Sequence, residues 1–353
     1  MPRILLILVL ELCLNARLLG QMGSMAAPTY TKDVAPIVQK NCQTCHRAGE
    51  AAPFPLLTYE EARPWASSIK LVVQQKIMPP WFADPAYGHF SNDRALTAKE
   101  ISTLVAWANA GAPEGDPKDA PPPVNFVEGW GIPKPDKIFE LPRAFAVPAS
   151  GMVEYQYVIF PTGFTEDKWV QMAEARPTER SVVHHIIAYV REPGSNYFKD
   201  QKTGVFFEAP PPQADEKTDR SALPSDFLVG YAPGQPAEIL SPGQAKLIKA
   251  GSDIVLEVHY TPTGKATTDR TRVGIVFAKE PPKERVLTLS ASNGTFKIPP
   301  GDPNHRVDAS FEGASRREAV ESSSPHAHAR ERFRVSAGFS KRRNAHHFAC
   351  ASL

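Results

Sequence analysis

The chain is poor in cysteine, carries almost no net charge and has no long apolar run. It contains four cysteines in 353 residues, and one of them, Cys13, lies in an apolar N-terminal segment. The other three cannot form the paired framework that holds small secreted domains together. Lys and Arg number 40 against 38 Asp and Glu, so the net charge of +2 gives no reason to expect a nucleic-acid or acidic partner.

The N-terminal apolar segment, residues 4–14, is shorter than the roughly 20 residues that span a bilayer. It follows Met1-Pro-Arg3 and precedes the small residues Ser24-Met-Ala-Ala27. A positive start, an apolar centre and small residues in this order are typical of a secretory signal. We therefore predict a signal peptide over residues 1–27 and a periplasmic or secreted protein. The alternative is a segment that stays as an N-terminal anchor.

Residues 28–115 have the apolar spacing of a small helical domain. The apolar positions are Val34, Ile37, Val38, Trp65, Ile69, Val72, Val73, Ile101, Leu104, Val105 and Ala108. This spacing predicts a helix that begins at Thr31, a second over residues 59–76 and a third after Thr97. Thr97 and Glu100 have the pattern of a capping box, and Gly111 stands where the third helix is expected to end.

The sequence Cys42-Gln-Thr-Cys45-His46 lies between the first two of these helices. Two thiols at this spacing can add to the two vinyl groups of one haem, and the next imidazole then lies under the iron. A bare C-x-x-C could also be a redox disulfide or half of a zinc site, but no second cysteine pair completes a zinc site. We therefore predict haem c bound covalently by Cys42 and Cys45, with His46 as an axial ligand.

The second axial ligand of that iron should come from a later part of the domain. Met78 is the best candidate because a thioether is a soft ligand and the prolines of Ile77-Met-Pro-Pro-Trp81 fix the loop. His89 is the alternative ligand, and Met78 could instead fill the core. The order of helix, C-x-x-C-H, methionine loop and helix resembles the class I cytochrome c domains. The resemblance implies electron transfer by a haem that Cys42, Cys45, His46 and Met78 hold.

The pattern changes after residue 115. Proline and glycine are dense over residues 116–136, which predicts an extended linker with a domain boundary near residue 125. From residue 137, short β-branched and aromatic runs alternate with Pro/Gly turns, and this predicts antiparallel β-sandwich domains. Residues 192–224 are polar and contain prolines, so they are expected to form a long loop.

Two adjacent histidines, His184 and His185, stand in the middle of an apolar, β-branched run. Neighbours on a regular strand point to opposite faces, so this pair can share a metal only if the strand bulges or ends there. The plain alternative is one buried, hydrogen-bonded histidine on each face. His259 lies on another alternating strand, and three imidazoles are a donor set that suits copper or zinc. Further along, His326 and His328 have the i, i+2 spacing that puts two imidazoles on one face of a strand.

Four motifs follow one another in a specific order, namely Val-Val-His184-His185, Gly230-Tyr-Ala-Pro-Gly234, Glu257-Val-His259-Tyr260 and Pro325-His326-Ala-His328. As a set they resemble the copper type II, ascorbate-dependent monooxygenases, which include the peptidylglycine α-hydroxylating and dopamine β-monooxygenases. The resemblance implies that His184, His185 and His259 hold an electron-transfer copper. It implies that His326 and His328 are two of the three ligands of an O2-binding copper. The fusion to a cytochrome c domain looks like a bacterial branch of this family.

The expected architecture is therefore multidomain. A small all-α cytochrome c domain (residues 28–115) precedes mainly antiparallel, jelly-roll-like β-sandwich domains, the first over residues 137–280 and the second beginning at 281–328. The second is expected to be incomplete, because the family needs a methionine ligand after the H-x-H pair and no methionine follows Met172. From about Glu312 the strand pattern gives way to basic clusters, so residues 329–353 are interpreted as an aberrant tail left by a truncation or frameshift. A natural basic tail is the alternative.

The resemblance implies C–H hydroxylation with O2, with electrons from ascorbate or from the fused haem. The substrate would be a small molecule or a peptide that no motif identifies. The linker would keep the haem at a high effective concentration near the copper. One alternative is an electron-transfer cytochrome that binds copper without monooxygenase activity, because the second copper site is incomplete. A structural sandwich with buried histidines is a third interpretation, and it predicts no stoichiometric copper.

Overall fold

A computed structural model describes residues 27–81, 93–209, 226–288, 296–302, 304–314 and 330–340. The chain divides into two compact units, one made of residues 1–48 and 52–125 and the other of residues 49–51 and 126–353. No helix within the described ranges is long and apolar enough to cross a membrane. Residues 1–26 of the predicted signal peptide, His89 and the pair His326 and His328 lie outside these ranges.

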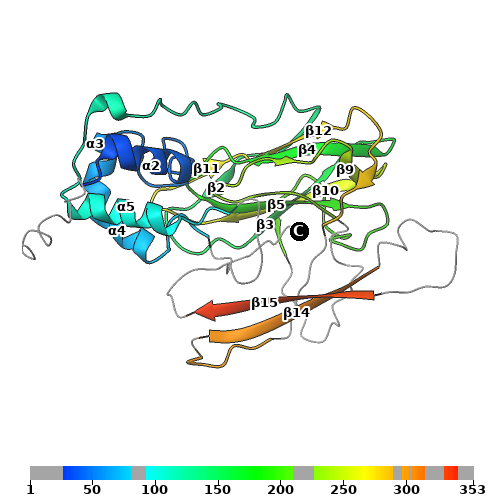
Figure 1. Ribbon diagram of the computed structural model, residues 1–353. Coiled ribbons are helices and arrows are strands. Elements are labelled where there is room, and N and C mark those ends of the chain that lie inside the picture. The colour runs from blue at the N-terminus through cyan, green and yellow to red at the C-terminus, as the bar shows by residue number, and fades with distance from the viewer. Residues whose placement is uncertain are drawn as a thin grey trace, which may run out of the picture. The chain divides into compact units, whose positions relative to one another are not determined.

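The first unit is helical and small (Figure 1). Its elements are η1 (Tyr30–Val34), α2 (Ala35–Asn41), α3 (Tyr59–Ala62), η2 (Arg63–Trp65), α4 (Ala66–Gln74), α5 (Ala98–Asn109) and η4 (Pro117–Asp119). Trp107 is fully buried at the centre of its core, where its ring Nε1 donates to the carbonyl of Pro113 at 3.0 Å. The predicted helix over residues 59–76 is divided by η2, because Pro64 has no N–H to continue the helical ladder.

The ends of α5 follow from its sequence. The Thr97 side chain accepts from the N–H of Glu100, and the Glu100 carboxylate accepts from the N–H of Thr97, so the predicted capping box is confirmed. Gly111 follows the cap residue Ala110 with a φ of +84°, a left-handed conformation that suits glycine. A second capping box, of Thr58 with Glu61, begins α3. The two capping boxes determine where α3 and α5 begin.

The second unit is mostly antiparallel β-structure, as predicted. Its strands are β1 (Lys137–Glu140), β2 (Phe145–Val147), β3 (Gln156–Pro161), β4 (Lys168–Arg176), β5 (Val183–Arg191), β6 (Phe207–Glu208), β7 (Asp226–Tyr231), β8 (Glu238–Ile239), β9 (Gln244–Ile248), β10 (Asp253–Tyr260), β11 (Thr267–Asp269), β12 (Arg272–Phe277) and β13 (Glu284–Arg285). The two larger sheets have the orders β1-β12-β4-β9-β13, with β8 beside β4, and β6-β3-β10-β5-β7, while β2 and β11 pair as a separate two-stranded sheet. The short β9–β13 pair is parallel, and the other pairs of these two sheets are antiparallel.

The two sheets are stacked as layers, with β4 and β12 in one and β3, β5 and β10 in the other (Figure 1). Their facing side chains form one apolar core, which includes Val273 and Ile275 of β12 and Ile186 of β5. On β10, Leu256, Val258 and Tyr260 belong to this core. The residues between them, including Glu257 and His259, therefore face away from the other sheet. This alternation is the one that the sequence of β10 predicts.

The second half of the predicted linker is attached to the sandwich. Ile132 is buried, and the N–H of Gly131 donates to the Glu174 carboxylate at 2.6 Å. The Trp130 ring lies beneath the guanidinium groups of Arg176 and Arg272, each 5.8 Å from the ring centroid. Residues 126–136 thus extend the β unit, and the extended connection is shorter than its proline and glycine content suggests.

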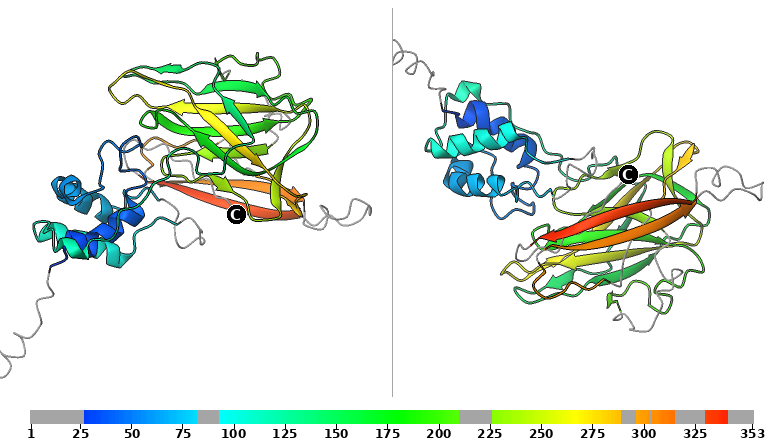
Figure 2. Two further views of the ribbon diagram at one scale, coloured as in Figure 1. Left: turned by 90° about the horizontal axis from the view of Figure 1, so that it is seen from above. Right: turned by 60° about the horizontal axis from the view of Figure 1, so that its bottom comes forward.

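Strands β14 (Asn304–Ala314) and β15 (Arg330–Ser340) pair as an antiparallel ribbon (Figure 2). The prediction that strand structure stops near Glu312 is therefore wrong for residues 330–340. The reason is a period-two pattern in which Phe333, Val335 and Ala337 alternate with polar residues or glycine. The register sets Phe333 opposite Phe311 and Val335 opposite Ala309. The segment is rich in basic residues, but its apolar residues still alternate as in a β-strand.

Candidate metal centre

An extra residue in β5 brings the adjacent histidines to one side of the sheet. His185 is opposite His259 of β10, and the next pair in the ladder is Val183 with Tyr260. Two residues of β5, His184 and His185, are therefore set against one of β10, which is a β-bulge. The sequence required an interruption of this kind for the two imidazoles to meet, and the register confirms it.

The three imidazoles of His184, His185 and His259 surround a common point. Their ring centroids form a nearly equilateral triangle with sides of 5.0, 5.1 and 5.3 Å. The rings are inclined to one another by 62–70°, so they do not stack on each other. One ligand atom from each lies within 4.8 Å of the others, and no other group of three His, Cys, Asp or Glu in the described ranges does so.

The spacing of the ring nitrogens fits a transition metal. The Nδ1 atoms of His184 and His185 are 3.0 Å apart. At a metal–nitrogen distance of about 2.0–2.1 Å, two such atoms subtend an angle of roughly 91–97° at the metal. Imidazole nitrogens bind copper and zinc well, whereas magnesium and calcium prefer oxygen ligands. The donor set therefore fits copper or zinc.

Tyr155 forms a wall of the site. Its ring is stacked on His259, with centroids 4.4 Å apart and planes inclined by 10°, and it lies 5.4 Å from the His185 ring. Burial raises the pKa of Tyr155, and the charge of Glu257 raises it further. The phenol therefore stays protonated at neutral pH and acts as a neutral aromatic surface against two of the three imidazoles.

Glu257 lies next to the imidazoles on the same side of β10. Its Oε1 is 3.5 Å from His185 Nε2, and its Oε2 accepts from the Tyr157 hydroxyl at 2.8 Å. Glu257 and Tyr157 are both buried. Desolvation raises the pKa of Tyr157, and the carboxylate beside it adds to the effect. The Nδ1 of His185 faces His184, while its Nε2 faces the carboxylate.

The buried carboxylate of Asp269 ties together the two segments that carry the histidines. Its Oδ1 accepts from the N–H and hydroxyl of Thr178 and from the N–H of Glu179, shortly before His184. Its Oδ2 accepts from the hydroxyl of Tyr260, the residue after His259, at 2.9 Å. The N–H and hydroxyl of Thr271 also donate to Oδ2. One side chain thus holds the start of β5 against the end of β10.

The C-x-x-C-H segment of the helical unit forms a tight turn at the end of α2. The N–H groups of Cys45 and His46 both donate to the carbonyl of Cys42, at 3.1 and 2.9 Å. His46 Nδ1 lies 3.1 Å from the Phe54 carbonyl, which leaves Nε2 as the nitrogen that could bind a metal. Desolvation lowers the pKa of His46, although the Phe54 carbonyl opposes this shift. Neutral imidazole is the form that can bind iron.

Cys42 and Cys45 are not joined in a disulfide, and both are partly buried. Burial, and then the charge of Cys45, raises the pKa of Cys42 to about 12. Phe54 lies against His46 at 4.9 Å and is stacked on Trp65 at 3.9 Å. Met78 follows α4 and is 39% exposed. Its assignment as an iron ligand stays a prediction.

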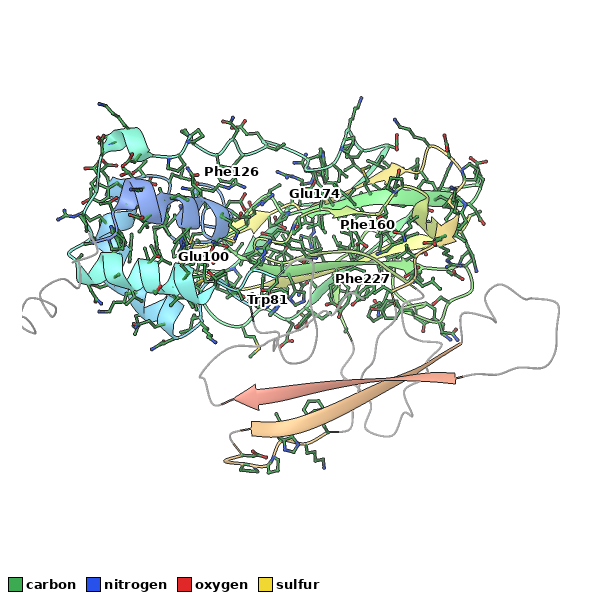
Figure 3. The ribbon with its side chains drawn as sticks, in the orientation of Figure 1. Trp81, Glu100, Phe126, Phe160, Glu174 and Phe227 are labelled. Atoms are coloured by element: carbon green, nitrogen blue, oxygen red, sulfur yellow. The ribbon has the colours of Figure 1, made fainter. Side chains whose placement is uncertain are left out.

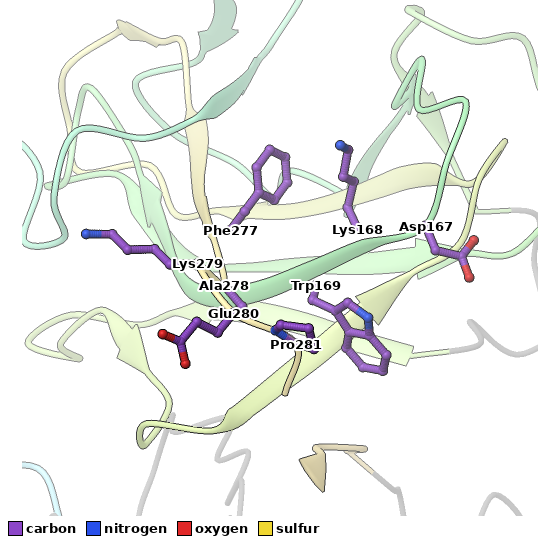
Figure 4. A pocket seen from close by; sticks show the side chains of 8 residues that line it. All are labelled: Asp167, Lys168, Trp169, Phe277, Ala278, Lys279, Glu280 and Pro281. Carbon is purple, nitrogen blue, oxygen red and sulfur yellow. The ribbon is translucent and has the colours of Figure 1, made fainter. Parts of the chain in front are cut away.

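A separate hollow of about 310 Å³ lies on the other sheet, where β4 begins and β12 ends (Figure 4). Trp169 and Phe277 contribute to its lining, but the side chains of Asp167, Lys168 and Lys279 diverge (Figure 4). Ligand sites usually have polar groups that converge on one point. The hollow therefore does not form a second candidate site.

The sequence matches no known protein-family model and no curated protein. The interpretation of the metal centre consequently depends on its own geometry. Of the residues that the sequence singled out, the structure brings together His184, His185 and His259. His305 is apart from this group and pairs with Asp302 at 3.0 Å. The Gly230-Tyr231 motif lies at the end of β7, opposite Ile187 and Ile186 of the histidine strand.

Sequence reasoning missed Tyr155, Tyr157 and the role of Glu257. The available signal was the pattern Tyr155-x-Tyr157 at the start of a strand and a glutamate two residues before His259. That signal could not be used without the register, which sets Glu257 opposite Tyr157 across the β10–β3 ladder.

Proposed function

We propose that the chain is a copper- and haem-dependent oxidoreductase whose electron-transfer copper is held by His184, His185 and His259. The observation that carries this proposal is that three imidazoles from two strands each place a ring nitrogen within 4.8 Å of the others. They do so at a bulge, where the regular pairing of β5 with β10 is interrupted. A sheet without a ligand to bind would gain nothing from such an arrangement of polar rings. Copper in this site would supply one-electron redox chemistry.

The residues of the chain orient and enclose this site. The bulge aims His184 and His185 at His259, and Asp269 holds the two strand ends in that register. Tyr155 covers one side of His259 with a neutral ring. His184 is the most exposed of the three, so an electron donor would approach from its side.

The reaction type that we propose is monooxygenation with O2, in which one oxygen atom enters a C–H bond of a small-molecule or peptide substrate. It follows from the order of the four motifs, three of which contain histidines, and from His326 and His328 as ligands of a second copper. The electrons would come from ascorbate or from haem c held by Cys42, Cys45, His46 and Met78. The tight turn that brings Cys42, Cys45 and His46 together and the orientation of the His46 ring support covalent haem.

Metal analysis of the haem-loaded protein, combined with O2 uptake under ascorbate, tests this function. Two bound coppers with O2 uptake that depends on substrate would support monooxygenation. One copper, retained with ascorbate-driven reduction but without O2 uptake, would support the alternative of an electron-transfer protein. Stoichiometric zinc in place of copper, or no bound metal, would overturn both.

A further inference from the structure

Glu257 is a buried carboxylate whose two oxygens have different partners. One oxygen lies 3.5 Å from His185 Nε2, and the other accepts from the Tyr157 hydroxyl at 2.8 Å. Removing a carboxylate from water costs free energy unless it is paired and hydrogen-bonded. One face of β10 packs in the apolar core between the sheets, whereas the face with Glu257 meets aromatic side chains. A valine or leucine at position 257 would pack against those rings without the cost of burying a charge.

Tyr157 is rigidly placed. It is opposite Glu257 in the ladder between β3 and β10. Its ring packs against Phe198 and Phe207, with centroids 5.0 and 5.7 Å away. The hydroxyl therefore meets Glu257 from a fixed position, and the carboxylate oxygen that remains is aimed at His185.

We propose that Glu257, held by Tyr157, is a positioning residue that fixes the tautomer of His185 and biases the three-histidine site towards Cu(II). This inference rests on the proposed function, because it assumes that the site binds copper. With its Nε2–H directed at Glu257 Oε1, 3.5 Å away, His185 would bind a metal through Nδ1, which lies 3.0 Å from His184 Nδ1. Metal-binding histidines are commonly oriented by a carboxylate in this way.

The charge of the carboxylate has a further consequence. A negative group near the site stabilises a divalent ion more than a monovalent one, because the interaction scales with the charge of the ion. Glu257 therefore lowers the reduction potential of the bound copper. An electron-transfer copper needs a reduction potential below that of its electron acceptor. The Glu257 carboxylate would help to set that reduction potential.

The test compares Glu257→Gln with wild-type protein and with Glu174→Gln. Glu174 is an equally buried glutamate on β4 of the other sheet, which makes it a matched control (Figure 3). Affinities for Cu(II) and Cu(I) are measured by competition with chelators, and the potential by redox titration. Glu257→Gln should weaken Cu(II) binding about tenfold, within the usual effect of an outer-shell partner. Cu(I) binding should change little, so the potential should rise by about 59 mV.

Glu174→Gln should leave both affinities and the potential at their wild-type values. Equal affinities and an unchanged potential in Glu257→Gln would overturn the proposal. Loss of both copper affinities in parallel would also overturn it, because a merely structural role predicts that result.

A second measurement needs no substitution and decides the matter if Glu257→Gln fails to fold. Cu(I) is diamagnetic, so the imidazole 15N shifts of the wild-type Cu(I) protein can be read by NMR. His185 should carry its proton on Nε2 and bind through Nδ1. Binding through Nε2 would overturn the proposal. A wild-type protein that binds no copper contradicts the proposed function itself, whereas a copper-binding protein with Nε2 ligation contradicts only the role of Glu257.

Discussion

At the scale of single residues, the candidate metal centre depends on groups other than its three histidines. Asp269 accepts six hydrogen bonds from Thr178, Glu179, Tyr260 and Thr271 while it is fully buried. Tyr155 and Tyr157 fix the surroundings of His259 and Glu257. Substitutions at these positions therefore test the support of the site while the three histidines stay in place.

Replacing Asp269 with asparagine should destabilise the β unit strongly. The substitution turns one acceptor oxygen into an NH2 group that faces donors, and an unsatisfied buried polar group costs about 1–3 kcal/mol. We expect a loss of about 3 kcal/mol in the free energy of unfolding, because several donors are affected at once. Tyr260→Phe removes one of the hydrogen bonds and should cost about 1 kcal/mol. Chemical denaturation of the two variants measures the difference, and equal costs would contradict the role of Asp269 as a shared acceptor.

Tyr155 should support copper binding through its ring. Stacked aromatic pairs contribute about 0.5–1.5 kcal/mol beyond their buried area, which corresponds to a factor of up to about ten in affinity. Tyr155→Leu should therefore weaken copper binding by about three- to tenfold, as measured by competition titration. Tyr155→Phe keeps the ring and should bind copper like the wild type. A loss in Tyr155→Phe as large as in Tyr155→Leu would assign the effect to the hydroxyl instead.

The residues of the candidate site were only partly predictable. His184 and His185 stood out because two imidazoles are unusual in a buried, β-branched run, and the family resemblance implied that they share a site with His259. Glu257 and Tyr157 are 100 positions apart, and only the register of β3 and β10 shows that they meet. Asp269 was missed for the same reason, since its partners come from three separate segments.

At the scale of secondary-structure elements, local signals determined the ends of helices and the alternation of strands. The capping box of α5 and the alternation of β10 are written in consecutive residues, so the sequence alone revealed both. The bulge in β5 was expected as a condition for metal binding, but its position relative to β10 depends on pairing across the sheet. Strand β15 was missed because its arginines made the segment look basic and irregular, although Phe333, Val335 and Ala337 alternate with other residues.

The cap of α5 offers a test in the helical unit. Thr97→Ala removes the acceptor for the N–H of Glu100 and should cost about 1 kcal/mol of stability. Thr103→Ala, in the middle of the same helix, removes no cap and should be neutral or slightly stabilising. Thermal or chemical unfolding of the helical unit, followed by circular dichroism, measures both. Similar losses in the two variants would show that the cap contributes nothing specific.

Glu100 should make the stability of this unit depend on pH. Burial opposes ionisation, but the hydrogen bonds from Thr97 and the charge of Lys40 lower the pKa of Glu100 on balance. A depressed pKa in the folded state contributes stability above the unfolded value of about 4.3, and this stability is lost as the pH falls through the folded-state pKa. Denaturation between neutral and acidic pH should show this loss in the wild type and a smaller one in Glu100→Gln. Parallel pH profiles would contradict the assignment.

At the scale of the whole molecule, two compact units are joined by a short proline-rich connection. Part of the stretch that composition assigned to the linker, residues 126–136, is held on the sandwich by Trp130, Gly131 and Ile132. Proline and glycine content indicates an extended segment, but it does not show which tertiary contacts hold that segment in place. The connection between the units is therefore shorter than predicted, and a shorter connection would raise the effective concentration of one unit near the other.

The proposed function predicts electron transfer from haem c in the helical unit to copper at the three histidines of the β unit. Reduced haem should be reoxidised faster in copper-loaded protein than in copper-free protein, and the rate should not depend on protein concentration because the reaction is intramolecular. Stopped-flow absorbance of the haem measures this rate. Identical rates with and without copper, or a rate proportional to protein concentration, would contradict direct transfer within one chain.

The copper content of the full chain tests the central claim most directly. After loading with copper and removal of loosely bound metal, His305→Gln should retain as much copper as the wild type. His259→Gln should retain one copper fewer per chain, because His259 supplies one of the three imidazoles and His305 does not. Equal copper contents in the wild type, His259→Gln and His305→Gln would contradict the assignment of His184, His185 and His259 as a copper site.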